Sequence, residues 1–485
     1  MQQPTVSAEK QYSVFTQHEK WFLVGTASVA GVFSPLTANI YFPAIPTIAS
    51  QFRKSIEMIN LTVTIYMVMQ GISPMFWGTL SDRWGRRPMI LACMIVLSLS
   101  CVGLALVPTS AYWLLMLLRC IQAAGSASTI ALGAGVIADI ASPSERGGLF
   151  GLFSMGPMIG PCLGPVIGGG LAQGLGWRAI FWFLCISSAA CALVILLLLP
   201  ETLRSLVGDG SIVPSAFYRP LIPIIGKSRQ PTAPNNRPLP KPFANPLRLF
   251  TYPDIVILLI FNGVLYAVFY SVTTTISSLF ADVYPFLDQT DIGLCFLAIG
   301  GGMVFGSVIT GRFLDRDYAA IKNSMIKKAQ SDPEKRDVKD VTKDENFPIE
   351  MARLRTMPIY VAVFVACTIG YGWCLKARVS LAGPLILQII IGYVTNAVMN
   401  TIQTLLLDLA PSQGSSITAC NNLIRCSLGA ALVSVIDLIL KAMGPGWTYV
   451  LLGGICVAVS PLMWVEIRWG PVWREGRRRR LADRN

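Results

Sequence analysis

The stretch Gly78-Thr-Leu-Ser-Asp82-Arg83-Trp-Gly85-Arg86-Arg87 separates two long apolar runs, residues 58–79 and 88–107. Its glycines permit a tight turn at a membrane surface. Its Asp and Arg side chains can form ion pairs that hold neighbouring helix ends together. A shorter version, Gly311-Arg312-Phe-Leu-Asp315-Arg316, follows a later apolar run with the same spacing from Gly to Asp. The repeat predicts two units of similar construction within one chain.

The composition around these stretches is typical of a chain that faces lipid. Of the 485 residues, 53% are hydrophobic and 13% are charged, whereas a soluble domain has about 25% charged residues. Apolar runs of about 18 or more residues indicate membrane helices. Twelve such runs occur, at residues 21–41, 58–79, 88–107, 111–137, 147–172, 178–199, 254–280, 290–311, 357–376, 381–406, 414–440 and 446–467. The predicted fold class is an all-α membrane protein, with twelve transmembrane helices in two pseudo-symmetric six-helix bundles.

Positive charge is concentrated on one side of the predicted helices. With the N-terminus in the cytoplasm, 31 of the 39 Lys and Arg residues fall in cytoplasmic segments. The outer loops hold only Arg53, Lys54, Arg178, Lys376, Arg378 and Lys441. This positive-inside pattern predicts that both termini are cytoplasmic. Because no basic patch with interleaved aromatic residues occurs outside the loops, the net charge of +13 does not indicate a nucleic-acid partner.

Polar segments divide the chain into bundles and connections. The predicted order is a cytoplasmic tail (1–20), a first bundle (21–200), a linker (201–252), a second bundle (253–468) with a cytoplasmic loop (312–356), and a basic tail (469–485). The linker includes a proline-rich run typical of a semi-rigid spacer. The loop is dense in Lys, Asp and Glu and is expected to be solvated. The Arg477–Arg480 run is expected to anchor the tail on anionic lipid or, alternatively, to act as a trafficking signal.

The sequence offers little for covalent chemistry or for holding a metal. All twelve Cys residues lie in apolar segments without a Cys-x-x-Cys pair, and the single His, His18, lies in the N-terminal tail. We therefore expect buried thiols, no metal site and no cofactor. A phosphate-binding loop, a His-Glu-x-x-His motif and a serine nucleophile elbow are all absent from the sequence, which argues against an enzyme and against ATP as the energy source.

Polar side chains within apolar helices predict a wet central site. Arg119 and Arg425 lie at membrane depth, where a charge costs about 2.5–3.5 kcal/mol on insertion scales, so water, a partner or a substrate should meet them. Two such arginines favour an anionic substrate, for example a carboxylate bound by both arms of a guanidinium. Arg119 could alternatively bond to backbone, and the residues on the second helix could be structural. The candidate cavity residues are Asn39, Tyr66, Gln70, Arg119, Gln122, Asn421, Asn422 and Arg425.

The fifth apolar run carries a glycine every four residues, at Gly156, Gly160, Gly164 and Gly168. This spacing places the glycines along one helix face, and a face of small residues lets another helix approach closely. Prolines beside them, including Pro161 and Pro165, permit bending. The pattern predicts a closely packed, deformable helix.

These motifs resemble those of the major facilitator superfamily. The stretch from Gly78 to Arg87 is similar to its loop signature, in which the residues here numbered Asp82 and Arg86 join an acid at the end of the fourth helix, here Asp139. The resemblance implies a cytoplasmic latch, and the simpler alternative is a charged anchor for the loop. The latch set is Gly78, Asp82, Arg83, Gly85, Arg86, Arg87 and Asp139, with Gly311, Arg312, Asp315 and Arg316 as its second-half echo. Arg119-x-x-Gln122 resembles the second motif of the superfamily, whose Arg faces the central cavity.

The segment Gly160-Pro161-Cys-Leu-Gly164-Pro165-Val-Ile-Gly168-Gly169 resembles the antiporter motif of the superfamily, although tight packing alone would also explain its glycines. With Glu201-Thr-Leu-Arg204 and Arg468-Trp-Gly-Pro, the chain resembles the fungal twelve-helix drug:proton antiporters, nearest to the branch of multidrug and citrate exporters. The resemblance implies protons as the coupling ion. The sequence departs from bacterial relatives because no Asp or Glu lies at a membrane centre in the first half, and Asp437 is the one clear intramembrane acid.

The expected function is secondary active, proton-coupled export of small organic molecules such as drugs, toxins or secondary metabolites. Export of organic acids such as citrate or itaconate is the alternative, and a scaffold or sensor on a transporter fold is a third. A monomer in the plasma membrane is expected, with the lipid bilayer and a small solute as partners. Asn60-Leu-Thr62 matches the glycosylation pattern, but Asn60 lies close to the predicted membrane surface.

Overall fold

The structure is a computed structural model that describes residues 13–141, 145–213, 215–222, 246–331, 348–410 and 414–482. The proline-rich run of the linker, residues 332–347 of the predicted loop and the first part of the N-terminal tail lie outside the described residues. "Outer" and "inner" below refer to the orientation predicted from the charge distribution.

The first half begins with α1, whose N-terminus is capped by Thr16 and Glu19 in a reciprocal capping box. Its elements are α1 (Gln17–Asn39), η1 (Phe42–Ala44), α2 (Ile45–Phe52), α3 (Ile56–Trp84), α4 (Arg86–Leu106), α5 (Tyr112–Ser126), α6 (Thr129–Ile140), α7 (Arg146–Leu175) and α8 (Arg178–Leu198). The short elements α9 (Arg204–Val207), η2 (Ala216–Tyr218) and η3 (Pro246–Thr251) follow. The fourth predicted helix is thus two, α5 and α6.

The second half contains fewer but longer helices. They are α10 (Pro253–Val283), α11 (Gln289–Ser331), α13 (Ile349–Leu354), α14 (Met357–Lys376), α15 (Ala382–Leu409), α16 (Gly414–Val459) and α17 (Pro461–Ala482). The eighth helix was predicted to end at residue 311, but α11 continues to Ser331. The polar residues after position 311 include no glycine or proline that would stop the helix before Ser331.

Twelve membrane crossings are confirmed in the described part of the chain. Eleven helical segments there are long and apolar enough to span a bilayer, and the last of them, Ser416–Arg477, has 62 residues. That segment is interrupted at Gly444, where φ is 71° and ψ is 166°, and Pro445 follows. A helix of 62 residues would be about 90 Å long, three times the thickness of the hydrocarbon core. The break at Gly444 therefore divides it into the eleventh and twelfth crossings.

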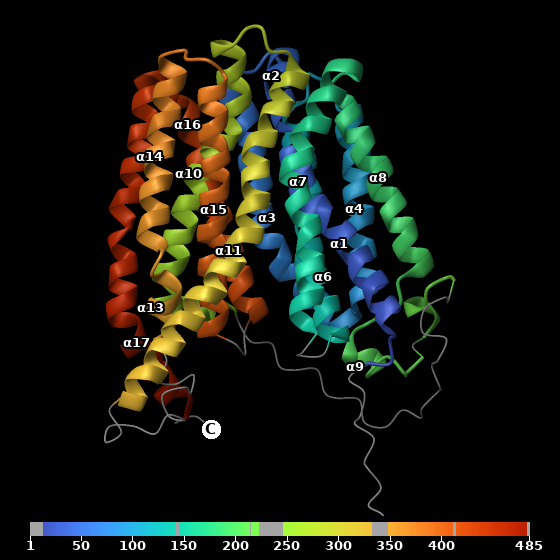
Figure 1. The fold of residues 1–485 in the computed structure, drawn as a ribbon. Coiled ribbons are helices and arrows are strands. Elements are labelled where there is room, and N and C mark those ends of the chain that lie inside the picture. The colour runs from blue at the N-terminus through green and yellow to red at the C-terminus, as the bar shows by residue number, and fades with distance from the viewer. Residues whose placement is uncertain are drawn as a thin grey trace, which may run out of the picture.

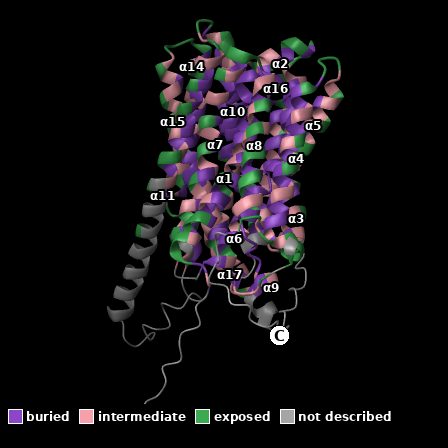
Figure 2. Ribbon diagram, turned by 90° about the vertical axis from the view of Figure 1, so that its right-hand side faces the viewer, coloured by how far each residue is buried: buried purple, intermediate pink, exposed green. Residues whose placement is uncertain are grey.

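The two halves repeat the same helix pairings (Figure 1). In the first half α1 packs on α7, α3 on α5, and α4 on α8; in the second half the matching pairs are α10 with α16, α11 with α15, and α14 with α16. The halves meet along a seam, in which α3 lies against α16 and α7 lies against α11. Figure 2 shows buried residues along the interior helices and exposed ones on the flanks. Large apolar side chains such as Trp113 and Ile186, 67% and 68% exposed, are suited to face lipid.

Hydrogen bonds join the halves from the outer end of the helices to their middle. At the outer end, Gln173 Nε2 donates to Asp288 Oδ2 at 2.7 Å, and Thr290 N–H donates to Gln173 Oε1 at 2.9 Å. At mid-helix, Asn422 Nδ2 donates to the Gln70 carbonyl at 2.7 Å. Toward the inner end of α3, by contrast, the space beside Gly78 is open, because a Cβ there would have nothing within 4 Å. The hydrogen bonds at the outer end therefore hold the described conformation closed on its outer side.

Candidate functional site

Arg86 joins three helices at the inner end of the first half. Its Nη1 lies 2.7 Å from Asp82 Oδ1 on α3, and its Nε lies 3.0 Å from Asp139 Oδ2 on α6. Nη1 also donates to Ser81 Oγ at 2.6 Å. The Asp139 side chain is 11% exposed and that of Asp82 is 64% exposed. Because solvent screens exposed ion pairs, the contact between Arg86 and Asp139 is the stronger one, while Arg83 is exposed.

The tight turn that the glycines of this motif permit falls at Gly85. Gly78 lies within α3, which continues to Trp84, and Gly85 takes φ 102° and ψ 152° between α3 and α4. This backbone region is nearly restricted to glycine. A Cβ at position 85 would also lie 2.3 Å from Glu201 Oε2. Two independent constraints therefore require glycine there.

Glu201 holds the start of α4, and sequence reasoning missed it as a site residue. Its carboxylate accepts the N–H groups of Arg86 at 2.8 Å, Arg87 at 3.3 Å, and Thr202 and Leu203 at 2.9 Å each. The side chain is fully buried. Burial raises the pKa of the Glu201 carboxyl, although the four N–H groups oppose that shift. An acid just after the sixth apolar run was the available signal.

Arg87 and Arg204 both donate hydrogen bonds to backbone carbonyls. The Arg87 guanidinium donates to the carbonyls of Phe217 at 3.0 Å and Leu196 at 2.8 Å. Arg204 Nε donates to the Asp139 carbonyl at 2.8 Å. Arg87 thus ties the chain leaving α8 to the start of α4, next to the ion pairs of Arg86.

We expect Gly85→Ala to destabilise the protein by about 3 kcal/mol or more, because the substitution combines backbone strain of about 1–3 kcal/mol with a clash against a buried carboxylate. Thermal unfolding of the purified protein in detergent measures this. Gly78→Ala is the matched control, since its Cβ meets nothing within 4 Å. Equal unfolding temperatures for the two variants would contradict the role assigned to Gly85.

The second half carries buried charge at its own inner end. Arg477 Nη1 lies 2.8 Å from Asp254 Oδ2, and Arg474 Nε lies 3.4 Å from Glu350 Oε1. Glu466 is also fully buried there. The expectation that the tail arginines anchor on lipid is wrong for Arg477, because the ion pair with Asp254 draws it into the protein. These acids went unnoticed because they belong to three separate helices.

The second-half echo of the loop motif lies inside a helix. Gly311, Arg312, Asp315 and Arg316 all fall within α11, so the expected loop does not begin there. Arg316 is exposed, and the side chains of residues 311–315 lie outside the described set.

The glycine face of α7 packs against α1. A Cβ at Gly156 would lie 2.4 Å from the Ser28 carbonyl, and one at Gly168 would lie 2.0 Å from the Ile40 carbonyl. The intervening glycines meet α1 backbone in the same way, at 2.7 Å for Gly160 and 3.2 Å for Gly164.

Gly169 and the neighbouring prolines extend the role of α7 across the seam. A Cβ at Gly169 would lie 2.4 Å from the Gln289 carbonyl of α11, and one at Gly293 would lie 2.5 Å from the Pro165 carbonyl. Pro161 and Pro165 both lie within the helix. α7 therefore contacts its own half and the other half through backbone on two faces.

Arg119 is enclosed at the centre of the molecule. Its side chain is fully buried, and its Cζ lies 4.3 Å from the Tyr41 ring centroid and 4.4 Å from that of Tyr66. Nη1 donates to Gln122 Oε1 at 2.6 Å, while Nε and Nη2 have no hydrogen-bond partner. Arg119 therefore bonds to a side chain rather than to backbone, and two of its three donor nitrogens are left unsatisfied.

Arg425 approaches the same centre from the second half. Its Cζ lies 4.6 Å from the Tyr266 ring centroid, its Nη2 donates to Asn422 Oδ1 at 2.9 Å, and its Nε has no partner. The Tyr266 and Tyr270 rings on α10 are 5.3 Å apart. Tyr270 interacts electrostatically with both Tyr66 and Arg119. A cluster of four tyrosines and two arginines, contributed by both halves, therefore forms across the seam.

Sequence reasoning missed Tyr266 and Tyr270, although phenols four apart in an apolar helix are a usable signal. Other predicted cavity residues bond within the protein. Asn39 Nδ2 donates to the Pro35 carbonyl at 2.7 Å in its own helix. Asn421 links Asn262 and Gln403 at 2.8 and 2.7 Å.

Of two further predicted residues, Tyr66 bonds within the first half and Gln70 bonds across the seam. Tyr66 OH lies 2.8 Å from Ser126 Oγ. Gln70 offers its carbonyl to Asn422, and its own Oε1 is buried without a partner.

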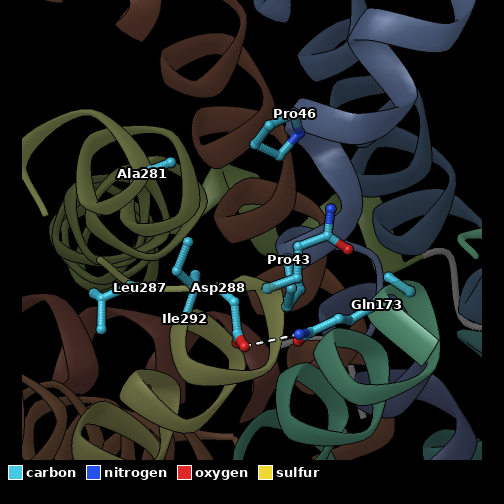
Figure 3. Close-up of a pocket in the computed structure, with 9 residues that line it drawn as sticks. Pro43, Pro46, Gln173, Ala281, Leu287, Asp288 and Ile292 are labelled. Atoms are coloured by element: carbon cyan, nitrogen blue, oxygen red, sulfur yellow. Dashed lines mark hydrogen bonds between the residues drawn. The ribbon is translucent and has the colours of Figure 1, made fainter. Parts of the chain in front are cut away.

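A separate pocket of about 410 Å³ lies on the outer seam. Figure 3 shows Gln173 and Asp288 facing one another across it, with Pro43 and Pro46 on the first-half side and Leu287 on the other. The arginine–tyrosine cluster contributes no lining residue. Among the residues that the structure describes, no group of three His, Cys, Asp or Glu could hold a metal ion.

Residues 27–434 match the family described as Major Facilitator Superfamily. The chain belongs to the major facilitator superfamily. It is accordingly a membrane transporter and not an enzyme. Major facilitator relatives include Citrate exporter 1 of Aspergillus niger, 40% identical over 98% of this chain and 91% of the relative. The MFS antiporter QDR2 of Candida albicans is 31% identical over 93% of this chain and 88% of the relative.

Solved major facilitator structures share the fold. The human organic anion transporter MFSD10 superposes with a TM-score of 0.57 at 16% identity, covering 92% of this chain and 99% of that one. A D-xylose–proton symporter superposes with a TM-score of 0.63 at 14% identity, covering 92% and 97%. These likenesses show the fold, and the named relatives place this chain among secondary transporters that export small organic molecules.

Proposed function

We propose that this transporter exports a small organic anion carrying one or more carboxylates, in exchange for protons. The observation that carries the proposal is Arg119, which is fully buried with two donor nitrogens, Nε and Nη2, unpartnered. A guanidinium in that state is stabilised by a bidentate carboxylate. The similarity to Citrate exporter 1 supports the same substrate class, and proton exchange is inferred from the antiporter relatives.

The charge balance of the central cluster supports an anionic ligand. Arg119 has tyrosine phenols, the Cys101 thiol and Gln122 as its neighbours, and Arg425 has Asn422 and Tyr266. None of these groups is an acid that is ionised at neutral pH. The two guanidinium charges therefore have no anionic partner in this cluster, and a dicarboxylate or tricarboxylate would supply one.

We propose that Arg86, Asp82 and Asp139 form a latch that stabilises one of two alternating states, because they connect the inner ends of α3, α4 and α6. One chain supplies both sides of the arginine–tyrosine cluster, which supports a monomer as the transporting unit. We propose the plasma membrane as its location, since an exporter there delivers its substrate directly to the outside.

Flux into proteoliposomes with an acidic lumen tests the proposal. We expect labelled citrate or itaconate to accumulate while protons leave, and a protonophore to abolish the accumulation. A cationic dye, added as the competing substrate class, should not move. Dye accumulation without carboxylate flux would instead support drug export, to which the similarity with QDR2 points.

A further inference from the structure

One hydrogen bond between the halves involves the intramembrane acid. Asn60 on α3 donates through Nδ2 to Asp437 Oδ2 on α16. The two residues are 1% and 7% exposed, which also leaves Asn60 closed to a glycan in this conformation. They lie near the outer end of the seam, one helical turn inward from the ion pair of Glu57 with Lys441. Separation of α3 and α16 on the outer side would break this contact and expose Asp437.

The groups around Asp437 leave it without a cation of its own. Its electrostatic neighbours are Glu57 on α3, Lys441 on α16 and Tyr449 beyond the Gly444 break. Lys441 is bound to Glu57, and its side chain is 68% exposed. A buried carboxylate whose hydrogen-bond donor is a neutral amide is costly, since burial removes the water that stabilises its charge.

The partner of Asp437 has one hydrogen-bonding position unfilled. Asn60 Oδ1 is buried and has no donor. An ionised carboxylate can only accept hydrogen bonds, so it cannot supply that donor. A protonated carboxyl group can donate its O–H to Asn60 Oδ1 while its other oxygen accepts from Nδ2. The closed seam therefore fits the protonated acid and satisfies both atoms of the amide.

We propose that Asp437 is a proton-binding residue of the outer gate, and that its protonation holds the outer side closed. When α3 and α16 part, the carboxylate faces the outer solution, and a hydronium ion gives it a proton and leaves water. The new O–H pairs with Asn60 as the gate closes. Loss of that proton to water breaks the O–H bond and leaves a buried charge that favours reopening. This proposal gives the proton of the proposed exchange a place to bind.

Hydrogen–deuterium exchange of the outer parts of α3 and α16 in lipid nanodiscs tests the proposal without any substrate. The measured quantity is the ratio of exchange rates between wild type and Asp437→Asn at one pH, which cancels the intrinsic pH dependence of exchange. Asn at position 437 can donate and accept like the protonated acid. We expect a ratio near one at pH 5 and at least about ten at pH 8. Lys441→Gln loses the ion pair with Glu57 but keeps the Asp437 carboxyl group, so its exchange relative to Asp437→Asn should still rise between pH 5 and pH 8.

A ratio that does not change with pH would overturn the proposal. If Asp437→Asn does not fold, Asp437→Ser removes the same ionisable group and takes its place. We also expect Asp437→Asn to lower flux at least ten-fold, because its outer side stays closed. If no carboxylate flux is found but the exchange ratio rises with pH as expected, the proposed substrate is refuted and the proposed role of Asp437 stands. The two proposals can therefore fail separately.

Discussion

Replacement of Arg119 by Gln is expected to lower carboxylate flux at least about 30-fold, since loss of a buried charge partner costs about 2–5 kcal/mol. The guanidinium supplies both the positive charge and the two unpartnered donors, Nε and Nη2. Initial rates in proteoliposomes at matched protein density measure this effect. Arg119→Lys should recover only part of the flux, because it keeps the charge and loses the planar pair of donors.

Stability separates a binding role for Arg119 from a structural one. The side chain is fully buried and pairs with no acid among the described residues, so Gln should leave the unfolding temperature unchanged or raise it. Lys54→Gln, at an exposed outer-loop position, is the control for charge removal. Flux within two-fold of wild type in Arg119→Gln would refute the anion site.

Gly168→Ala is expected to destabilise the protein by about 3 kcal/mol, near the upper end for overpacking. The added methyl would lie 2.0 Å from the carbonyl of Ile40, the C-cap residue of α1, and backbone cannot move aside as a flexible side chain can. α1 and α7 would have to separate along much of their contact, which should also reduce transport. Thermal unfolding in detergent and initial flux rates measure the two effects.

Gly170→Ala is the matched control for this prediction, because its Cβ would have nothing within 4 Å. It lies two residues away on the same helix and changes helix propensity by the same amount. If both variants unfold at the wild-type temperature, the close packing of α7 on α1 does not require glycine at position 168, and this prediction is wrong.

The helical architecture could be predicted from the sequence because a bilayer imposes a local rule. Every spanning segment must satisfy its own backbone hydrogen bonds and present apolar side chains over about 20 residues. Hydropathy therefore identified twelve crossings, including the pair separated by Gly444 that is otherwise one continuous helix. The same rule predicted Arg119 and Arg425 as site residues, since placing a charge at membrane depth costs free energy wherever it occurs.

The partners of these residues depended on tertiary structure. The glycine spacing in α7 predicted close packing but could not say that α1 is the partner, and the motif around Gly85 did not reveal Glu201. Asn60 and Asp437 are 377 residues apart. The sequence showed Asn60 only as part of a glycosylation pattern and Asp437 only as an isolated acid. Which side chains meet is set by how the two halves pack, because each contact across the seam joins distant parts of the chain. Composition and local pattern determine which segments enter the membrane, whereas only packing between the segments decides which buried polar groups satisfy one another and which remain free for a ligand or a proton.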